Sequence, residues 1–582
     1  TFDVAPASTA TNPGLLLSGG TGFTNTATAA VTKTGTGLLR VLNTFQAPTL
    51  NINQGTWEFG DGTTAAGAST YGGNMNVSIA SGATLSYNTP AATIMDSGST
   101  TFTGAGTILK KGTGTVRWNT TAGTFALGAG SLIDVQGGTF IGGSNSNEVW
   151  TNNKSSLNVA SGATFDGSEA NVFVDALTGA GSIKTGWNTS GGSITVGING
   201  TSAGSTNNPT GVAYNAAGTA TFTGTVAPSA GTLGSFVKSG AGTQILVGAN
   251  TYGGTTTIKG GTLQIGDGVG GAGHTSNVGT GAIVLDGANS TLSFKNLANV
   301  TLSSAQTITG NGTLMSDKPL TLSGKITVQK SAVDNNANLT IKTTDTNVNT
   351  GSSDLNINAA VVKGDANNVS FTAESATSLA LNGNIGNKTT DASNATGTLD
   401  VSLTSLGGGV NNNYSYGLYL NKVIDANGGV VTLTSTTHNS NAATGTAAVN
   451  FYNGSGITAG SFTVTGTQTV GNVGNTRQGI SFGGTSNFTT TGSGVSKFSG
   501  TTNEGLYFMS AGIYTAGTIN LDSGSNGGQI VMEGVSMPFT AGIRSEANIN
   551  TKGNVTLGKS TAALFQRSAT ITARSEERRV GK

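Results

Sequence analysis

Residues 238–268 decide the fold, and they read KSGAGTQILVGANTYGGTTTIKGGTLQIGDG. Apolar and polar residues alternate in runs of four or five, as in Thr262-Leu263-Gln264-Ile265, and Gly or Asn separates the runs. Because a strand sends alternate side chains to opposite faces, we expect Ile258, Leu263 and Ile265 to point inward. Gly and Asn supply the positive φ that sharp corners demand. The pattern therefore predicts three short strands joined by tight corners.

The same pattern recurs elsewhere in the chain. Residues 33–62 also open with Lys-x-Gly-x-Gly and close on Gly-Asp-Gly, and a third copy starts at Lys110 but lacks that ending. A single coil of three strands cannot bury its inner face alone, so coils must stack. We predict an all-β fold, a right-handed parallel β-helix or β-solenoid of elongated form. The side chains of Thr, Ser and Asn suit it, because they can form hydrogen-bonded ladders between coils.

The repeat changes character along the chain. We predict a β-solenoid segment over 1–316 with the repeats just described, and a second over 317–573 with looser units. Residues 574–582 read RSEERRVGK and contain six charged residues, whereas charged residues make up 9% of the whole chain. We expect these nine residues to be a non-native tail and the chain to be a fragment at both ends.

Composition excludes several classes of protein. The chain has no Cys, which rules out disulfides, zinc–thiolate sites and thiol nucleophiles. A net charge of +1 offers no electrostatic footprint for nucleic acid. No apolar run approaches the 18 or so residues that a transmembrane helix requires. Gly is 93 of 582 residues, which together with recurrent Val, Ile and Thr favours many short strands over helices.

Residues 240–268, with ANTYGGTT at 249–256, resemble the autotransporter-associated β-strand repeat. The looser segment resembles the haemagglutinin-type repeats of large bacterial adhesins. The resemblance implies a β-helical passenger exported across a Gram-negative outer membrane, with an outer-membrane barrel expected downstream of the present sequence. The repeat brings no catalytic residue. Its motif positions here are Gly240, Gly242, Asn250, Tyr252, Gly253, Gly254, Gly261, Leu263, Ile265 and Gly266.

Three motifs could suggest chemistry, and each is better explained as a strand or turn. Residues 553–560 read GNVTLGKS and match the phosphate-loop pattern, but their middle has strand composition. Ser97 and Ser523 follow an Asp as protease nucleophiles do, yet the chain has only two His residues and neither is suitably placed. The glycine run 266–274 ends at His274 and offers too few ligands for a metal.

Two further features concern carbohydrate. The 26 acidic residues are spread thinly and form no evident pair of catalytic carboxylates. Tyr414 and Tyr416 share one face of their segment, so they could contact a glycan or form an aromatic ladder between coils, and the ladder is favoured.

These observations predict a non-enzymatic passenger, displayed on the cell surface or secreted, with an adhesive or surface-structural role. The alternative is a β-helical carbohydrate-active enzyme, a polysaccharide lyase or hydrolase. We expect no cofactor, no metal site and no nucleic-acid partner. The expected partners are surface glycans or proteins of a host or its matrix, and this chain has no membrane segment of its own.

Overall fold

A computed structural model describes residues 1–574 except for a set of short segments and one longer one. The exceptions are 7–12, 20–21, 25–28, 64–74, 92–93, 97–99, 119–122, 144–147, 189–190, 198–217, 270–276, 296–298, 332–336, 346–353, 387–396, 408–415, 440–445, 471–476, 503, 510–517, 523–528, 537–542, 546–547, 553–554, 558–563 and 567–570. Of the tail at 574–582, only Arg574 lies among the described residues. It ends strand β57 (Ile571–Arg574).

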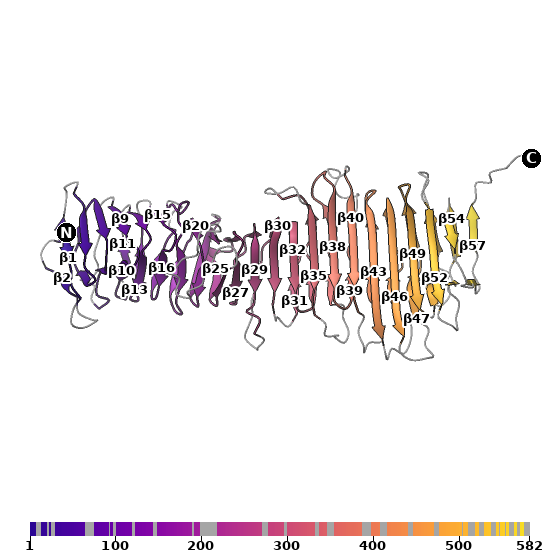
Figure 1. The fold of residues 1–582 in the computed structure, drawn as a ribbon, viewed down its shortest axis with the longest axis horizontal. Coiled ribbons are helices and arrows are strands. Elements are labelled where there is room, and N and C mark those ends of the chain that lie inside the picture. The colour runs from indigo at the N-terminus through magenta and orange to yellow at the C-terminus, as the bar shows by residue number, and fades with distance from the viewer. Residues whose placement is uncertain are drawn as a thin grey trace, which may run out of the picture. The chain divides into compact units, whose positions relative to one another are not determined.

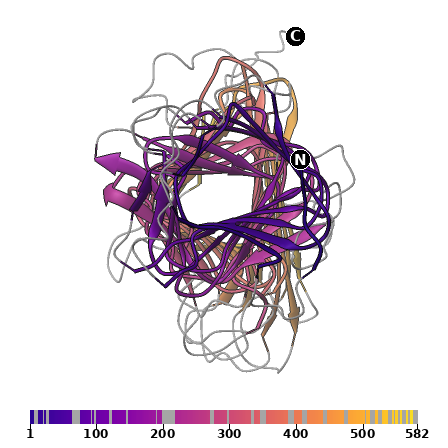
Figure 2. The same ribbon diagram turned by 90° about the vertical axis from the view of Figure 1, so that its left-hand side faces the viewer.

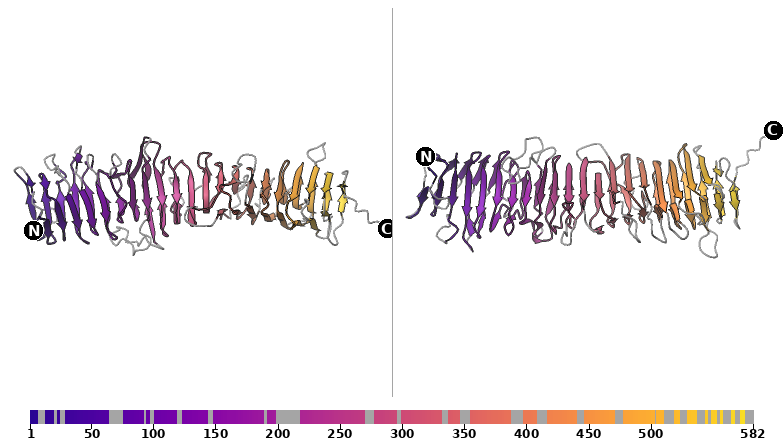
Figure 3. Two further views of the ribbon diagram at one scale, coloured as in Figure 1. Left: turned by 90° about the horizontal axis from the view of Figure 1, so that it is seen from above. Right: turned by 60° about the horizontal axis from the view of Figure 1, so that its bottom comes forward.

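The described residues form short strands and no helix, and the strands pair in parallel. The chain divides into two compact units. Unit 1 comprises residues 1–284 and 289–297, and unit 2 comprises residues 285–288 and 298–582. In each unit the strands lie side by side in successive coils, as Figures 1 and 3 show. The prediction of an all-β parallel β-helix is therefore confirmed, while its handedness and the segment boundary at 316/317 stay predictions.

Unit 1 has three strands in each regular coil. Seen from its end in Figure 2, the chain winds around a closed course. One coil comprises β9 (Met75–Ile79), β10 (Thr84–Asn88) and β11 (Ile94–Asp96), and the next comprises β12 (Thr100–Gly104), β13 (Thr107–Lys111) and β14 (Thr115–Arg117). Each strand of the first coil pairs in register with its counterpart in the second. Three faces of stacked strands result.

The interior of unit 1 is filled by apolar side chains stacked from coil to coil. Phe102 lies in register with Phe125, and their rings stack with centroids 5.2 Å apart. Trp150 stacks on the other side of Phe125 at 4.0 Å. All three side chains are almost completely buried. Burial of such a side chain contributes about 1.5–3 kcal/mol, which no single coil could obtain alone.

The segment that decided the fold begins at the last residue of one strand of unit 1 and forms the next three strands. These four strands are β26 (Ser235–Lys238), β27 (Thr243–Leu246), β28 (Thr256–Ile258) and β29 (Gly261–Ile265). Ile258, Leu263 and Ile265 are fully buried, whereas Thr257 and Gln264 are partly exposed. The alternation in the sequence thus predicted the inner and outer faces correctly.

Unit 2 also has three faces. A coil there comprises β34 (Ile326–Val328), β35 (Asn338–Thr343) and β36 (Leu355–Ile357), and the next comprises β37 (Val361–Lys363), β38 (Val369–Ser375) and β39 (Leu379–Leu381). Counterparts again pair in register.

One buried column of unit 2 consists of hydroxyl residues. Its members, one from each successive coil, are Ser316, Thr343, Ser375, Ser405 and Ser435. The Thr343 hydroxyl donates a hydrogen bond to Ser375 Oγ at 3.1 Å. This bond joins two members of the column, as the Thr- and Ser-rich composition favours, whereas the Ser405 hydroxyl donates to the carbonyl oxygen of Thr377.

Substitution of Ile258 by Asp should unfold unit 1 more readily. The new carboxylate would be buried without a partner, so we expect a loss of at least about 3 kcal/mol. Thr257→Asp, on the outer face of the same strand, should cost less than about 1 kcal/mol. All four Trp residues belong to unit 1, so urea unfolding followed by Trp fluorescence reports on this unit. Equal losses at the two positions would contradict the assigned faces.

Candidate functional site

The Lys that opens each repeat has a structural role at a corner of the coil. Lys33, Lys110 and Lys238 are fully buried. The ammonium of Lys238 donates to the carbonyl oxygens of Ser239 at 2.6 Å, Gly240 at 2.9 Å and Gly260 at 3.1 Å. Gly260 belongs to the following coil, two residues beyond the register partner of Lys238. The Lys side chain therefore ties its own corner to the corner stacked on it.

The other two Lys residues repeat this arrangement. Lys110 bonds the carbonyls of Lys111, Gly112 and Gly137, and Lys33 bonds those of Thr34, Gly35 and Gln54. Three acceptors need three N–H groups, which only the charged ammonium supplies. Sequence reasoning registered the Lys-x-Gly-x-Gly spacing but missed this role, although an isolated Lys recurring at one repeat position is a usable signal.

Burial opposes the charge on these Lys residues. It lowers the pKa of Lys110 to about 8 and, against the raising effect of Asp175, that of Lys238 to about 7. It also lowers the pKa of Lys33, where Asp3 acts in the opposite direction. The carbonyl cluster must compensate for desolvation of the ammonium, so these groups hold the fold together and are not exposed for chemistry.

Asn250 and Tyr252 of the repeat are buried structural residues. The Asn250 side chain accepts from Val226 N at 2.9 Å and donates to Gly248 O at 3.1 Å and Asn277 O at 2.7 Å, which lie in successive coils. The Tyr252 hydroxyl bonds Thr256 Oγ1 at 2.8 Å, and burial raises the pKa of Tyr252. Asn250 thus connects neighbouring coils by hydrogen bonds, and Tyr252 does so by stacking on Phe236 of the preceding coil, with ring centroids 6.1 Å apart.

The glycines of the repeat allow the backbones of successive coils to lie close together. Gly261 has φ +61°, and a Cβ there would lie 2.3 Å from Gly242 O. A Cβ at Gly253 or Gly254 would meet a backbone oxygen of the preceding coil at 2.3 or 2.4 Å. Gly240 and Gly266 also have positive φ, and Gly242 supplies the carbonyl oxygen that Gly261 approaches. The repeat motif therefore encodes corners and stacking contacts.

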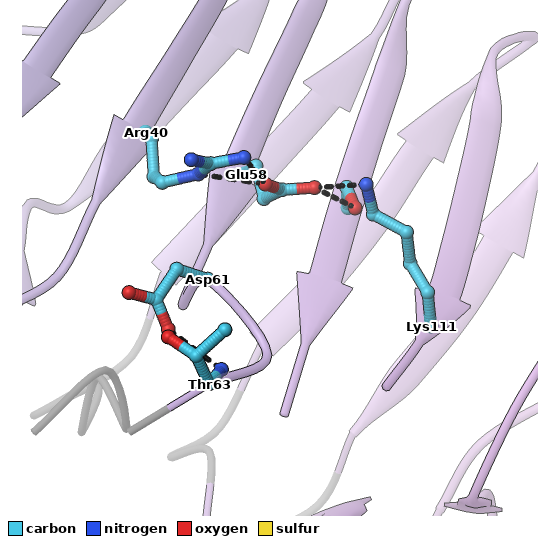
Figure 4. Close-up of polar contacts among 6 residues, drawn as sticks. Arg40, Glu58, Asp61, Thr63 and Lys111 are labelled. Atoms are coloured by element: carbon cyan, nitrogen blue, oxygen red, sulfur yellow. Dashed lines mark hydrogen bonds and ion pairs between the residues drawn. The ribbon is translucent and has the colours of Figure 1, made fainter. Parts of the chain in front are cut away.

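A buried carboxylate, that of Glu58, has two cationic partners on other strands of unit 1 (Figure 4). Glu58, in β8 (Thr56–Phe59), is fully buried, and its Oε1 lies 2.8 Å from Arg40 Nη2. Its Oε2 lies 2.5 Å from Lys111 Nζ and accepts from Ser86 Oγ at 2.9 Å. Both carboxylate oxygens are thus engaged by neighbouring coils. The arrangement fixes the stack and leaves neither oxygen for a substrate.

A buried acidic residue in unit 2 lies just before β36. Asp354 is 2% exposed, and its Oδ1 has no hydrogen-bond partner in the described part of the chain. Burial and then the charge of the nearby Asp345 raise the pKa of Asp354 to about 7. Asp354 therefore takes up a proton on folding within the physiological range of pH.

Of the two Tyr residues for which a glycan contact or an aromatic ladder was considered, Tyr414 lies outside the described residues. Tyr416 is half-buried and stacks on Tyr419, with ring centroids 5.6 Å apart. Tyr419 in turn lies 5.9 Å from Tyr452, which is 51% exposed. The structure therefore groups Tyr416 with Tyr419 and Tyr452.

The motifs weighed for chemistry fall largely outside the described residues. Val555–Leu557 forms strand β55, as its composition predicts, but the rest of GNVTLGKS is not described. Ser97, Ser523 and His274 also lie outside, while His438 belongs to β43 (Val430–Asn439). Within the described ranges, no three His, Cys, Asp or Glu residues gather as a metal site would require. Nor do those ranges contain a helix with the length and hydropathy to cross a membrane.

The fold and its corners define a class of protein, a parallel β-helix built from passenger-type repeats. A family model of the passenger-associated transport repeat matches residues 236–265. Over 207 residues the chain is 34% identical to the Adhesin BmaC autotransporter of Brucella suis biovar 1 (strain 1330). That match covers 34% of this chain and 5% of the relative, so the chain spans a small part of the relative's length. No solved structure matches.

The chain thus contains an autotransporter passenger repeat, at the residues where the sequence pattern indicated one. This repeat and the adhesin relative support a cell-surface or secreted location in a Gram-negative bacterium.

Lys238→Met should destabilise unit 1 by about 2–3 kcal/mol, because it leaves three corner carbonyls without their donor. Lys259→Met provides the matched control, since Lys259 is exposed on the same repeat and should change stability by less than about 0.5 kcal/mol. Urea unfolding followed by Trp fluorescence measures both. A loss no larger for Lys238 than for Lys259 would refute the structural role of the corner Lys.

Asp354 should make unit 2 less stable as pH rises. Its folded pKa of about 7 lies above the unfolded value near 4, so its contribution is complete below about pH 4 and is lost as pH rises through about 7. Asp354→Asn should therefore protect the amides of β36 and β39 from hydrogen exchange at pH 8 and change little at pH 5.

Asp365→Asn is the control, because its effect on the stability of unit 2 at pH 8 should be opposite to that of Asp354→Asn. The Asp365 carboxylate accepts from Lys330 N at 2.7 Å and Asn367 N at 2.8 Å, and these bonds with the nearby Lys363 hold its pKa below the usual value despite burial. Loss of the Asp365 charge should therefore weaken the protection of amides from hydrogen exchange at pH 8. If Asp354→Asn also weakened protection at pH 8, the assigned direction would be wrong.

Proposed function

We propose that this chain is an adhesive, non-enzymatic segment of an autotransporter passenger, and that it binds other surfaces through the outer faces of its coils. The observation that carries the proposal is the difference in side chains between the inner and outer faces of the coils. The inner faces are closed by stacked apolar side chains, whereas the outer faces present short polar side chains in regular columns. The adhesin relative supports the same role.

The outer columns offer many weak contacts of one kind. On unit 1, Asn158 donates to Asp134 at 2.8 Å, one coil away. On unit 2, exposed Asn550 donates to Asn520, which donates to Asn487, at 2.9 and 2.8 Å. Amide and hydroxyl groups ordered in this way can bind a partner by hydrogen bonds repeated along the stack.

The low charge of the chain leads to a prediction about how adhesion depends on ionic strength. Because the net charge is +1 and charged residues are 9%, adhesion should depend little on ionic strength. Beads coated with the chain should adhere to cultured epithelial cells or to immobilised matrix proteins and glycans more than albumin-coated beads do. Adherence should change by less than about twofold between 50 and 500 mM salt.

Two results would contradict the proposed adhesive, non-enzymatic function. Adherence no greater than that of albumin would refute the proposal. Release of reducing sugars from polysaccharides by the purified chain would instead favour the carbohydrate-active enzyme. Beads coated with heat-unfolded chain test whether the ordered columns, and not composition alone, produce adherence.

A further inference from the structure

The three clustered Tyr residues of unit 2 belong to its outer face. In β41 (Leu418–Leu420), Leu418 and Leu420 are buried and Tyr419 between them points outward. Tyr416 stacks on Tyr419 with an angle of 25° between the rings, and Tyr452 is tilted by 45° from Tyr419. Three aromatic rings therefore adjoin one another at the surface.

These rings are separate from the aromatic core. The interior of unit 2 contains its own cluster, in which Phe451 stacks on Phe482 at 5.3 Å and meets Phe488 edge-on at 5.0 Å. Phe451 is fully buried, whereas its neighbour Tyr452 is 51% exposed. Among the residues of unit 2 whose burial the structure describes, Tyr452 is the one exposed aromatic side chain. Stacking between coils does not require that exposure.

Neutral amide side chains border the rings. Asn358, Asn382 and Asn421 precede Tyr452 in one column, each directly after a strand of successive coils. Asn382 donates to Asn358 Oδ1 at 2.9 Å on the exposed surface. Amide donors and acceptors thus lie beside an apolar ring surface, at a spacing of about 4.8 Å per coil.

This combination matches a particular ligand chemistry. A pyranose ring has an apolar C–H face that packs against an aromatic ring, and equatorial hydroxyls that both donate and accept hydrogen bonds. Few polar groups placed around an apolar surface are typical of small-ligand sites. Burial, and then the neighbouring phenols, raise the pKa of Tyr419, which keeps this phenol uncharged.

We propose that Tyr416, Tyr419 and Tyr452 form a platform that binds pyranose rings of a neutral polysaccharide, with Asn382 and Asn421 as hydrogen-bonding neighbours. The proposal rests on the adhesive function proposed above and assigns it a ligand class. It replaces the pair Tyr414 and Tyr416 with a set defined by ring contacts.

Affinity electrophoresis of the purified chain tests the platform. The probes are two neutral polysaccharides, hydroxyethylcellulose and galactomannan, with alginate as a charged comparison. At least one neutral probe should retard the chain, and alginate should not. Tyr452→Ala and Tyr419→Ala should each weaken retardation about tenfold, the loss expected for one aromatic contact. Tyr452→Phe should retain most of it, because the ring remains.

Trp187→Ala is the matched control. Trp187 is 44% exposed in β22 (Ser182–Asn188) of unit 1, outside the platform, so its loss should leave retardation unchanged. Thermal unfolding of every variant separates binding from stability. No retardation of the wild-type chain by either neutral probe would overturn the proposal. So would Ala variants that lose thermal stability but bind as before, since the rings would then serve only as a ladder.

The same variants distinguish this inference from the broader function. If beads coated with Tyr452→Ala adhere to cells as well as wild-type beads do, while the neutral probes fail to bind, adhesion stands and the glycan platform falls. If the wild-type beads themselves do not adhere, the proposed function fails whatever the probes show.

Discussion

Parallel stacking in register is the constraint on which the rest of the structure depends. Each side chain lies about 4.8 Å from its counterpart in the next coil, so a residue type that suits one coil must tolerate a similar neighbour on both sides. Apolar residues satisfy this on the inner faces, where Phe stacks on Phe and Leu on Leu or Ile. Hydroxyl and amide residues also satisfy it, because each can donate in one direction and accept in the other. Like charges cannot satisfy it, because they would repel each other in adjacent coils. This repulsion accounts for the low content of charged residues, 9%.

Where the chain does bury charge, it surrounds the group with complementary partners. Glu58 is bracketed by Arg40 from one coil and Lys111 from another, so no like charges stack. At the corners, each Lys ammonium is surrounded by three backbone carbonyls. Corners are where a solenoid leaves strand pairing, and the Lys ammonium adds hydrogen bonds to the corner carbonyls there. A long side chain that ends in three N–H groups satisfies a corner and its stacked neighbour together.

The strands and their faces could be predicted from sequence because they depend on a period of two residues. Thr262-Leu263-Gln264-Ile265 gives its inner and outer faces without reference to any other residue. The contacts between coils could not be predicted in this way. Asn250 bonds atoms of three coils, at residues 226, 248 and 277, and the insertions between those coils differ in length. The Tyr platform shows the same limit. Tyr416 and Tyr419 are neighbours in sequence, but Tyr452 joins them only because the next coil brings it alongside.

Function on such a fold must lie outside the coil. The interior is occupied from face to face, and its polar groups, the hydroxyl ladder and the corner Lys residues, are used in stacking. Repetition that stabilises the inside also orders the outside, since a side chain on an outer strand recurs at the spacing of the coils. A partner that itself repeats, as a polysaccharide does, can meet several such side chains without any one contact being strong. In the proposed platform, the exposed ring of Tyr452 beside the Asn column would give this general surface a preference for one ligand.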